Sequence, residues 1–175
     1  MLEKVSRPVI VVDYDPQWPL LYEEEKKNIL AVIGHKVLAI EHIGSTAVPG
    51  LGAKPIIDIM VCVNNGADAE ECVPLLRQIG YADVTPQEGA SDWYYCLDKG
   101  IHSVGYHLHL VKHGSCFAKK HLIFRDFLRS HPDVAQQYYE MEKMLAEKYR
   151  FNRVAYNEAK TSFIESVVIR ARQRC

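Results

Sequence analysis

The chain has 175 residues, of which 48% are hydrophobic and 25% are charged. This length and composition are typical of a globular domain with its own core, and we expect a single domain over residues 1–175. Its 21 basic and 22 acidic side chains give a formal net charge of −1, so it lacks the excess positive charge that holds long nucleic acids. Local basic patches would still suit a small phosphate-bearing ligand.

The cysteines and the N-terminus bear on the compartment. The 5 cysteines are odd in number and scattered, and they form no C-x-x-C pair, which argues against a disulfide framework and a thiolate zinc site. We therefore expect free thiols. The N-terminus has no apolar signal segment, and no stretch approaches the roughly 20 apolar residues that span a bilayer. These features favour a cytoplasmic protein without membrane contact.

The first third of the chain predicts a helix, a strand and a loop. Asp15 can cap a helix that has Pro16 in its first turn and continues to about Ile33. Residues 37–43 alternate with the period of two that is typical of a strand. Three glycines and two prolines within residues 44–55 indicate a loop.

The next segment is apolar with one conspicuous exception. Residues 56–63 predict a strand in which Asp58 is the polar residue. Continuous apolar strands are usually central and covered on both faces, so a carboxylate within one needs an explanation. A helix over residues 67–79 follows and ends at Gly80.

The remaining chain separates into strands and then helices. The expected strands are residues 81–85, 93–97 and 103–111, and the expected helices are residues 117–130, 133–149 and 156–172. Short turn-rich segments, 87–92 and 98–100, separate the three strands, so we expect antiparallel neighbours. This segregation predicts an α+β fold with a mixed sheet of about five strands, flanking helices and a C-terminal helical segment.

The loop after the first strand is a candidate phosphate cradle. Gly44 permits close backbone approach, and Ser45 and Thr46 add hydroxyl donors and free amides beside it. A tight turn without a ligand is the alternative, because a Gly-Ser pair alone is weak evidence.

Asp58 is the candidate centre of the site. A carboxylate inside a buried strand costs several kcal/mol unless it is paired, hydrogen-bonded or bound to a cation. Lys54 is its nearest candidate partner in the sequence. The alternative is that Asp58 fixes the loop through backbone amides.

His107 and His109 alternate with apolar residues, so both point to one face of a strand with Cα atoms about 6.5 to 7 Å apart. That spacing suits two imidazoles on one cation or one phosphate, and His42 ends a neighbouring strand. The alternative is one core and one surface histidine. With Asp58, the two histidines are the predicted catalytic residues and ligands of a divalent metal of unspecified identity.

The C-terminal helices offer cations that can reach a ligand from across a cleft. They carry Arg125 and Arg129 near two phenylalanines, then His131, and finally Tyr156 and Lys160 at i and i+4 on one helical face. A solvated helix surface is the alternative for each of them.

Several stretches of the chain resemble the GrpB family. They are Glu41 to Leu51, Ala53 to Ile59, Phe124 to Pro132, Tyr14 to Trp18 and Tyr156 to Lys160. The resemblance spans almost the whole chain. It implies a GrpB-like domain with a nucleotidyltransferase-like core over about residues 9–112 and a helical part over about residues 115–175.

The nucleotidyltransferase superfamily, to which that family is similar, has a Gly-Ser loop and three carboxylates that hold two divalent metals. Counting from Gly44, Asp58 falls at the second carboxylate and Ile56 at the first, while His107 and His109 lie on the strand expected to supply the third. Imidazoles suit Zn²⁺, Mn²⁺ or Fe²⁺ better than Mg²⁺. This departure from the superfamily pattern argues against ordinary nucleotidyl transfer.

Three functional hypotheses follow. The first is a domain, and a transferase with an atypical site, that binds a nucleotide or phosphometabolite through Gly44, Ser45, Thr46, Lys54, Arg125, Tyr156 and Lys160. The second is an inactive ligand-sensing or interaction module. The third is a hydrolase or transferase whose metal is held by Asp58, His107 and His109.

Overall fold

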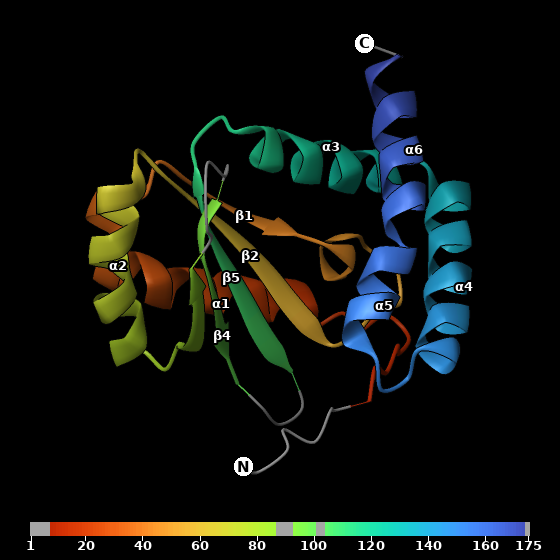
Figure 1. Cartoon of the computed structure of the whole chain (residues 1–175), viewed down its shortest axis with the longest axis horizontal. Coiled ribbons are helices and arrows are strands. Elements are labelled where there is room, and N and C mark those ends of the chain that lie inside the picture. The colour runs from red at the N-terminus through yellow and green to blue at the C-terminus, as the bar shows by residue number, and fades with distance from the viewer. Residues whose placement is uncertain (1–7, 87–92, 101–103, 174–175) are drawn as a thin grey trace.

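Five strands form one mixed sheet in the order β1-β2-β5-β4-β3 (Figure 1). The protein is represented by a computed structural model that describes residues 8–86, 93–100 and 104–173. The strands are β1 (Ala39–Ile43), β2 (Ile56–Val63), β3 (Ala82–Pro86), β4 (Trp93–Lys99) and β5 (Gly105–Lys112). Strands β2 and β5 are parallel, and the other three neighbouring pairs are antiparallel. The mixed sheet and the antiparallel β3, β4 and β5 confirm the sequence prediction.

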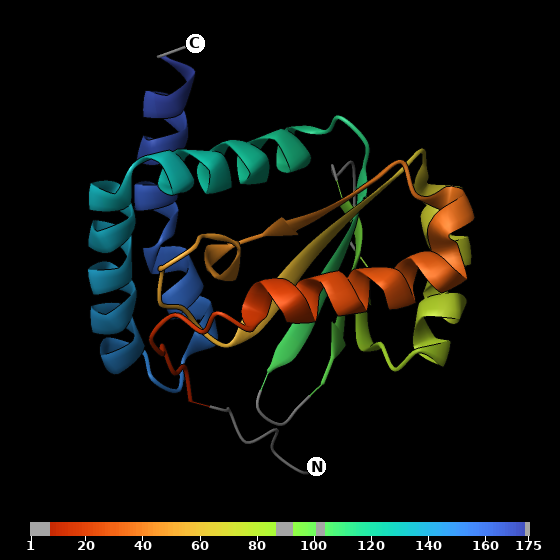
Figure 2. The same cartoon turned by 180° about the vertical axis from the view of Figure 1, so that it is seen from behind.

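Helices cover both faces of the sheet. They are α1 (Trp18–Ile33), α2 (Gly66–Gln78), α3 (Cys116–Ser130), α4 (Pro132–Lys148), α5 (Arg153–Ala159) and α6 (Thr161–Arg172). Figure 2 shows α1 lying across one face, where α2 also packs, and α3 lies over the other face against β1 and β5. Helices α4, α5 and α6 gather beside α3 at one side of the molecule (Figure 1).

The alternation of side chains along β2 divides the core in two. Ile57, Ile59 and Val61 face α1 and α2 and are fully buried. Met60 and Cys62 face the other way and pack with α3. Asp58 shares this second face, near the start of β2.

The loop between β1 and β2 is held between the sheet and the C-terminal helices. Val48 and Leu51 are buried in the core that α3, α4 and α6 form. Ala53 pairs with Val12 through two backbone hydrogen bonds of 2.9 Å. The loop is therefore part of the packed structure, and its first turn is a short 3₁₀ helix over Ser45–Ala47.

Two predicted helices differ from the structure. The first helix begins at Trp18, because Asp15 does not cap it and instead accepts a hydrogen bond of 2.9 Å from the Gln17 amide. The single helix predicted over residues 156–172 is two helices that meet at Lys160, whose amide bonds back only three residues to Asn157. Helix α5 starts earlier than predicted because Asn152 caps it, accepting from the Ala155 amide at 3.0 Å.

Two smaller predictions concern membrane spans and thiols. Over the described ranges, no helix combines the length and apolar character needed to cross a bilayer. Cys62, Cys72, Cys96 and Cys116 are free, as predicted. Cys175 and the turn over residues 87–92 lie outside the described residues.

Candidate functional site

The turn after β1 brings the Gly-Ser loop onto Asp58. Gly44 has a φ of 74°, a conformation that residues with a Cβ rarely adopt. A Cβ atom at this position would lie 2.6 Å from Asp58 Oδ2. Gly44 is therefore required both by the backbone of the turn and by the carboxylate packed against it.

Replacing Gly44 with alanine is expected to lower the free energy of unfolding by more than the replacement of Gly50. Both glycines have positive φ, which costs about 1–3 kcal/mol for a residue with a Cβ, but nothing lies within 4 Å of a Cβ at Gly50. Only Gly44→Ala must also displace Asp58. Urea unfolding of the two variants measures the difference, and equal losses would contradict the close packing of Gly44 on Asp58.

Thr46 and His42 stabilise the loop from inside. The Thr46 hydroxyl donates to Ile56 O at 3.2 Å and therefore accepts from His42 Nε2 at 2.9 Å. The His42 ring stacks on Tyr22 with 4.7 Å between ring centroids. Burial lowers the pKa of His42 to about 4, so this histidine is neutral at physiological pH. The Thr46 hydroxyl is thus engaged within the protein and is not free to donate to a ligand.

Asp58, His107 and His109 converge on one face of the sheet. In the parallel register of β2 and β5, Asp58 lies opposite His107. Asp58 Oδ1 is 3.3 Å from His107 Nδ1 and 3.8 Å from His109 Nε2. The three residues that the sequence grouped are therefore neighbours in the fold.

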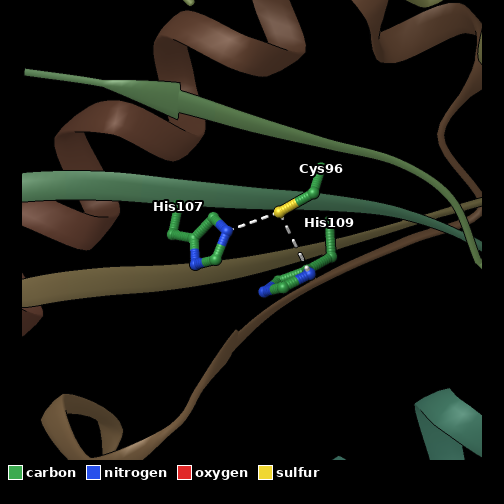
Figure 3. A group of neighbouring side chains, drawn as sticks. All are labelled: Cys96, His107 and His109. Carbon is green, nitrogen blue, oxygen red and sulfur yellow. Dashed lines mark hydrogen bonds between the residues drawn. The ribbon is translucent and has the colours of Figure 1, made fainter. Parts of the chain in front are cut away.

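Cys96 completes this cluster from β4 (Figure 3). Its Sγ atom contacts His107 Nε2 and lies 3.7 Å from His109 Nδ1. Each imidazole thus faces Cys96 with one ring nitrogen and Asp58 with the other. Cys96, His107 and His109 form the only group of at least three potential metal ligands within the described residues whose donor atoms all lie within 4.8 Å of one another. Asp58 does not belong to that group.

The cluster perturbs its own ionisation. Burial raises the pKa of the Asp58 carboxyl, but hydrogen bonds and positive charge from His107 and His109 outweigh it and hold that pKa well below its usual range. Burial lowers the pKa of His107, but its bonds to Asp58 and Cys96 prevail and raise it to about 10. Burial also raises the pKa of the Cys96 thiol, yet the two histidines bring it down to about 7. A Cys96 thiolate is therefore accessible near neutral pH.

A cavity of about 180 Å³ lies between this cluster and the C-terminal helices. The sheet side is lined by Gly44, Ser45, Thr46, Lys54, Ile56, Asp58, His107 and His109. The helical side includes Lys120, Glu142, Arg153 and Lys160. Residues separated by more than 100 positions in the sequence therefore share one cavity.

Glu142 organises the helical wall of the cavity. It is 1% exposed and accepts hydrogen bonds from the Tyr156 hydroxyl at 3.0 Å and from Lys160 Nζ at 3.1 Å. Ser45 Oγ, in the Gly-Ser loop, donates to it at 3.4 Å. Tyr156 is fully buried and does not itself line the cavity, but the ammonium groups of Lys54 and Lys160 lie 4.9 Å and 4.6 Å from the centroid of its ring.

Among the described residues, no carboxylate forms an ion pair with Lys54. Its ammonium lies 4.9 Å from the centroid of the Tyr156 ring, and it forms no ion pair with any residue in the described part of the chain. Burial, and then the charge of Lys160, lower the pKa of Lys54 to about 8. The charges of Asp58 and Glu142 oppose this shift but do not cancel it, so the Lys54 ammonium is only partly compensated.

Three other candidates lie away from the cavity. Arg125 pairs with Glu41 at 2.7 Å and donates to His42 O at 3.0 Å, so its guanidinium ties α3 to β1. Arg129 Nε donates to Ala47 O at 2.9 Å and holds the loop. His131 stacks on Phe127 at the end of α3. The structure brings none of them to the cavity that Lys54 and Lys160 line.

The sequence reasoning did not identify Cys96 or Glu142 as site residues. Cys96 lies in a strand directly before the histidine strand, and the antiparallel register sets it opposite His109. The short connection between these two strands was the sequence signal that predicts their antiparallel pairing. Glu142 has no comparable signal, because its partners come from segments remote in the sequence.

The two-metal site of nucleotidyltransferases requires more carboxylates than this cavity offers. Ile56 lines the cavity where the first acid would stand, and Asp58 is engaged by His107 and His109. The other carboxylate of the cavity, Glu142, is engaged by Tyr156 and Lys160, so no free pair of carboxylates provides the oxygen ligands that two hard divalent ions need. The residues present do not fit that pair of metals.

Comparison with solved structures establishes the fold. The crystal structure of conserved protein GrpB from Enterococcus faecalis matches with a TM-score of 0.84 at 32% identity, covering 94% of this chain and 98% of that one. A chain in the structure of the GLD-2/RNP-8 complex matches with a TM-score of 0.59 at 10% identity, covering 90% of this chain and 60% of that one. The second likeness shows the fold alone, and that fold is nucleotidyltransferase-like, as predicted.

Comparison of sequences gives the family. The model of the family described as GrpB protein matches residues 8–170. The UPF0157 protein BH1888 of Halalkalibacterium halodurans is 37% identical over 171 residues, which cover 97% of this chain and 86% of that protein. The chain therefore belongs to the GrpB family.

Proposed function

We propose that the cavity binds the phosphate group of a nucleotide or of a phosphorylated metabolite. The observation that carries this proposal is Lys54, a partly buried cation beside the Gly-Ser loop with no carboxylate paired to it within the described ranges. Removing an ammonium from water is costly unless an anion compensates it. A phosphate in the cavity supplies that anion.

The surrounding charges support an anionic ligand. Arg153 and Lys120 line the cavity with Lys54 and Lys160, and Lys160 alone of these reaches Glu142. The Gly44 turn lines the sheet side of the same cavity, as Lys54 does. The cations and the loop thus face the same space from the helical part and from the sheet.

The size of the cavity limits which part of the ligand it encloses. About 180 Å³ is smaller than the roughly 300–1,000 Å³ of pockets that enclose drug-sized ligands. The cavity accommodates a phosphate or pyrophosphate group, and the remainder of the ligand extends outside it. Recognition is therefore expected to depend on the phosphate.

The proposed function is binding of the ligand, without nucleotidyl transfer by two metal ions. Ile56 stands where the resemblance expects the first carboxylate of that chemistry, and the two acids that line the cavity, Asp58 and Glu142, are engaged by protein partners. The protein is accordingly expected to bind a nucleoside triphosphate without releasing pyrophosphate from it. Pyrophosphate release that depends on Asp58 would contradict this form.

The affinity for ATP, whose phosphate groups are already ionised at pH 8, is expected to fall as the pH rises above about 8. The pKa of Lys54 is about 8 in the free protein, and a bound phosphate raises it, so the complex takes up a proton. Binding is therefore strongest below pH 8. Above that value the binding constant falls by about tenfold per pH unit, because binding takes up one proton.

Isothermal titration calorimetry between pH 7 and pH 10, in buffers with different ionisation enthalpies, measures the affinity and the proton uptake directly. Adenosine without phosphate is the ligand control and should not bind. Lys27→Met is the protein control, because Lys27 is exposed on α1, on the opposite face of the sheet. An affinity for ATP that does not fall above pH 8, or no binding at all, would overturn the proposal.

A further inference from the structure

Two neighbouring cross-strand pairs place four potential metal ligands on one face of the sheet. In the antiparallel register of β4 and β5, Cys96 lies opposite His109 and Asp98 lies opposite His107. Asp98 Oδ1 is 3.4 Å from His107 Nε2, the same ring nitrogen that contacts Cys96. A thiol, two imidazoles and a carboxylate thus meet on the histidine-bearing face of β4 and β5.

The spacing of the donor atoms fits a tetrahedral ion. Figure 3 shows the Cys96 sulfur lying between the two imidazoles, and its distance to His109 Nδ1 is 3.7 Å. Bonds of about 2.3 Å to sulfur and about 2.0–2.1 Å to nitrogen place such donors about 3.5 Å apart. Small rotations of Cys96, His107 and His109 are therefore enough to place one ion between them, whereas the Asp98 carboxylate, which lies farther than 4.8 Å from at least one of the other donors, must turn inward to complete the set.

In both histidines, the ring nitrogen that points away from Cys96 already has a partner. His107 Nδ1 and His109 Nε2 face Asp58 Oδ1 at 3.3 Å and 3.8 Å. A carboxylate on the ring nitrogen that does not bind the metal is the usual arrangement around metal-bound imidazoles, where it orients the ring and fixes its tautomer. Asp58 occupies that position for both ligands at once.

We propose that Cys96, His107 and His109 bind one Zn²⁺ ion, with Asp98 as the fourth ligand and Asp58 as the carboxylate that orients the two imidazoles. A thiolate and one carboxylate carry two negative charges, which neutralise the dication. Four protein ligands leave no open position, so the ion stabilises the pairing of β4 with β5 and is not a reaction centre. This ligand set replaces the set of Asp58, His107 and His109 that the sequence suggested.

The proposed metal is separate from the phosphate proposed for the cavity. His107 and His109 line the cavity along with Asp58, whereas Cys96 and Asp98 do not. The ion would therefore lie behind the imidazoles as seen from the cavity. Metal binding is expected in Lys54→Met as in the unmodified protein, so each proposal can fail without the other.

Titration of Co²⁺ into the metal-free protein, purified without a histidine tag, tests the site. We expect one Co²⁺ per chain, with a near-ultraviolet thiolate-to-cobalt charge-transfer band and tetrahedral d–d bands, and we expect Zn²⁺ to displace it. Cys96→Ser should abolish the charge-transfer band, and the matched variant Cys116→Ser should keep it because Cys116 is exposed on α3. Absence of the band, or its persistence in Cys96→Ser, would overturn the proposal.

Two further measurements remain informative even if the Cys96→Ser variant does not fold. In the unmodified protein, Zn²⁺ should slow alkylation of Cys96 relative to protein in EDTA, while Cys116 reacts at the same rate in both. Asp58→Asn should keep the charge-transfer band but weaken Zn²⁺ binding by about 10- to 100-fold. Equal alkylation of Cys96 with and without Zn²⁺ would refute the site.

Discussion

Replacing Glu142 with alanine is expected to lower the free energy of unfolding by about 3–5 kcal/mol. The carboxylate is 1% exposed and accepts hydrogen bonds from Tyr156 and Lys160. Its removal leaves the Lys160 ammonium, whose side chain is only 12% exposed, without a counter-charge and beside Lys54. Losing one partner of a buried ion pair is far more costly than losing both.

Urea unfolding with linear extrapolation measures this loss. Glu140→Ala is the matched control, because Glu140 lies in the same helix, is 53% exposed and pairs with Lys143 on the surface. That change should stay within about 0.5 kcal/mol of the unmodified protein. Similar losses in the two variants would show that Glu142 does not compensate the cations around the cavity.

Replacing Lys54 with methionine is expected to weaken pyrophosphate binding and to stabilise the free protein. Loss of one partner of a desolvated charge pair costs about 2–5 kcal/mol of binding energy, which is at least about 30-fold in affinity. In the absence of ligand, the methionine removes a cation that burial and Lys160 disfavour. The same side chain thus contributes to binding at the expense of stability.

The effect of pH on stability separates this explanation from simple loss of packing. The pKa of Lys54 is lowered in the folded state to about 8, so between pH 8 and about 10.5 the unfolded state holds the extra proton and stability rises with pH. Below pH 8 both states are protonated and the penalty is complete. Lys54→Met should therefore gain most at neutral pH and least near pH 10.5, as measured by urea unfolding across that range. A gain that does not change with pH would contradict the assignment.

The sequence predicted the elements whose cause is local. Two strands were predictable from the alternation in residues 37–43 and the apolar run of residues 56–63. The common face of His107 and His109 was predictable from their spacing of two residues. The short connections predicted the antiparallel β3, β4 and β5. The sequence also marks Gly44 as a loop glycine and Asp58 as a carboxylate within an apolar strand, and the structure places the two residues in contact.

Features that depend on packing between remote segments were not predictable. Asp15 and Pro16 offered a plausible helix start, but the side chain of Asp15 bonds the Gln17 amide before the helix begins. Arg125 carried the charge expected of a phosphate ligand, yet Glu41 and the His42 carbonyl use its guanidinium. Which cation stays unpaired depends on which carboxylates the fold brings near it, and local patterns do not contain that information.

The burial of Val48 and Leu51 under the C-terminal helices has a consequence for the kinetics of ligand capture. A loop whose apolar side chains are already packed has little backbone entropy left to lose, so it is preorganised before a phosphate arrives. Association should then be a single step that rises linearly with ligand concentration, without the plateau that a slow closing motion imposes. The speed of recognition would depend on how quickly the anion sheds its water.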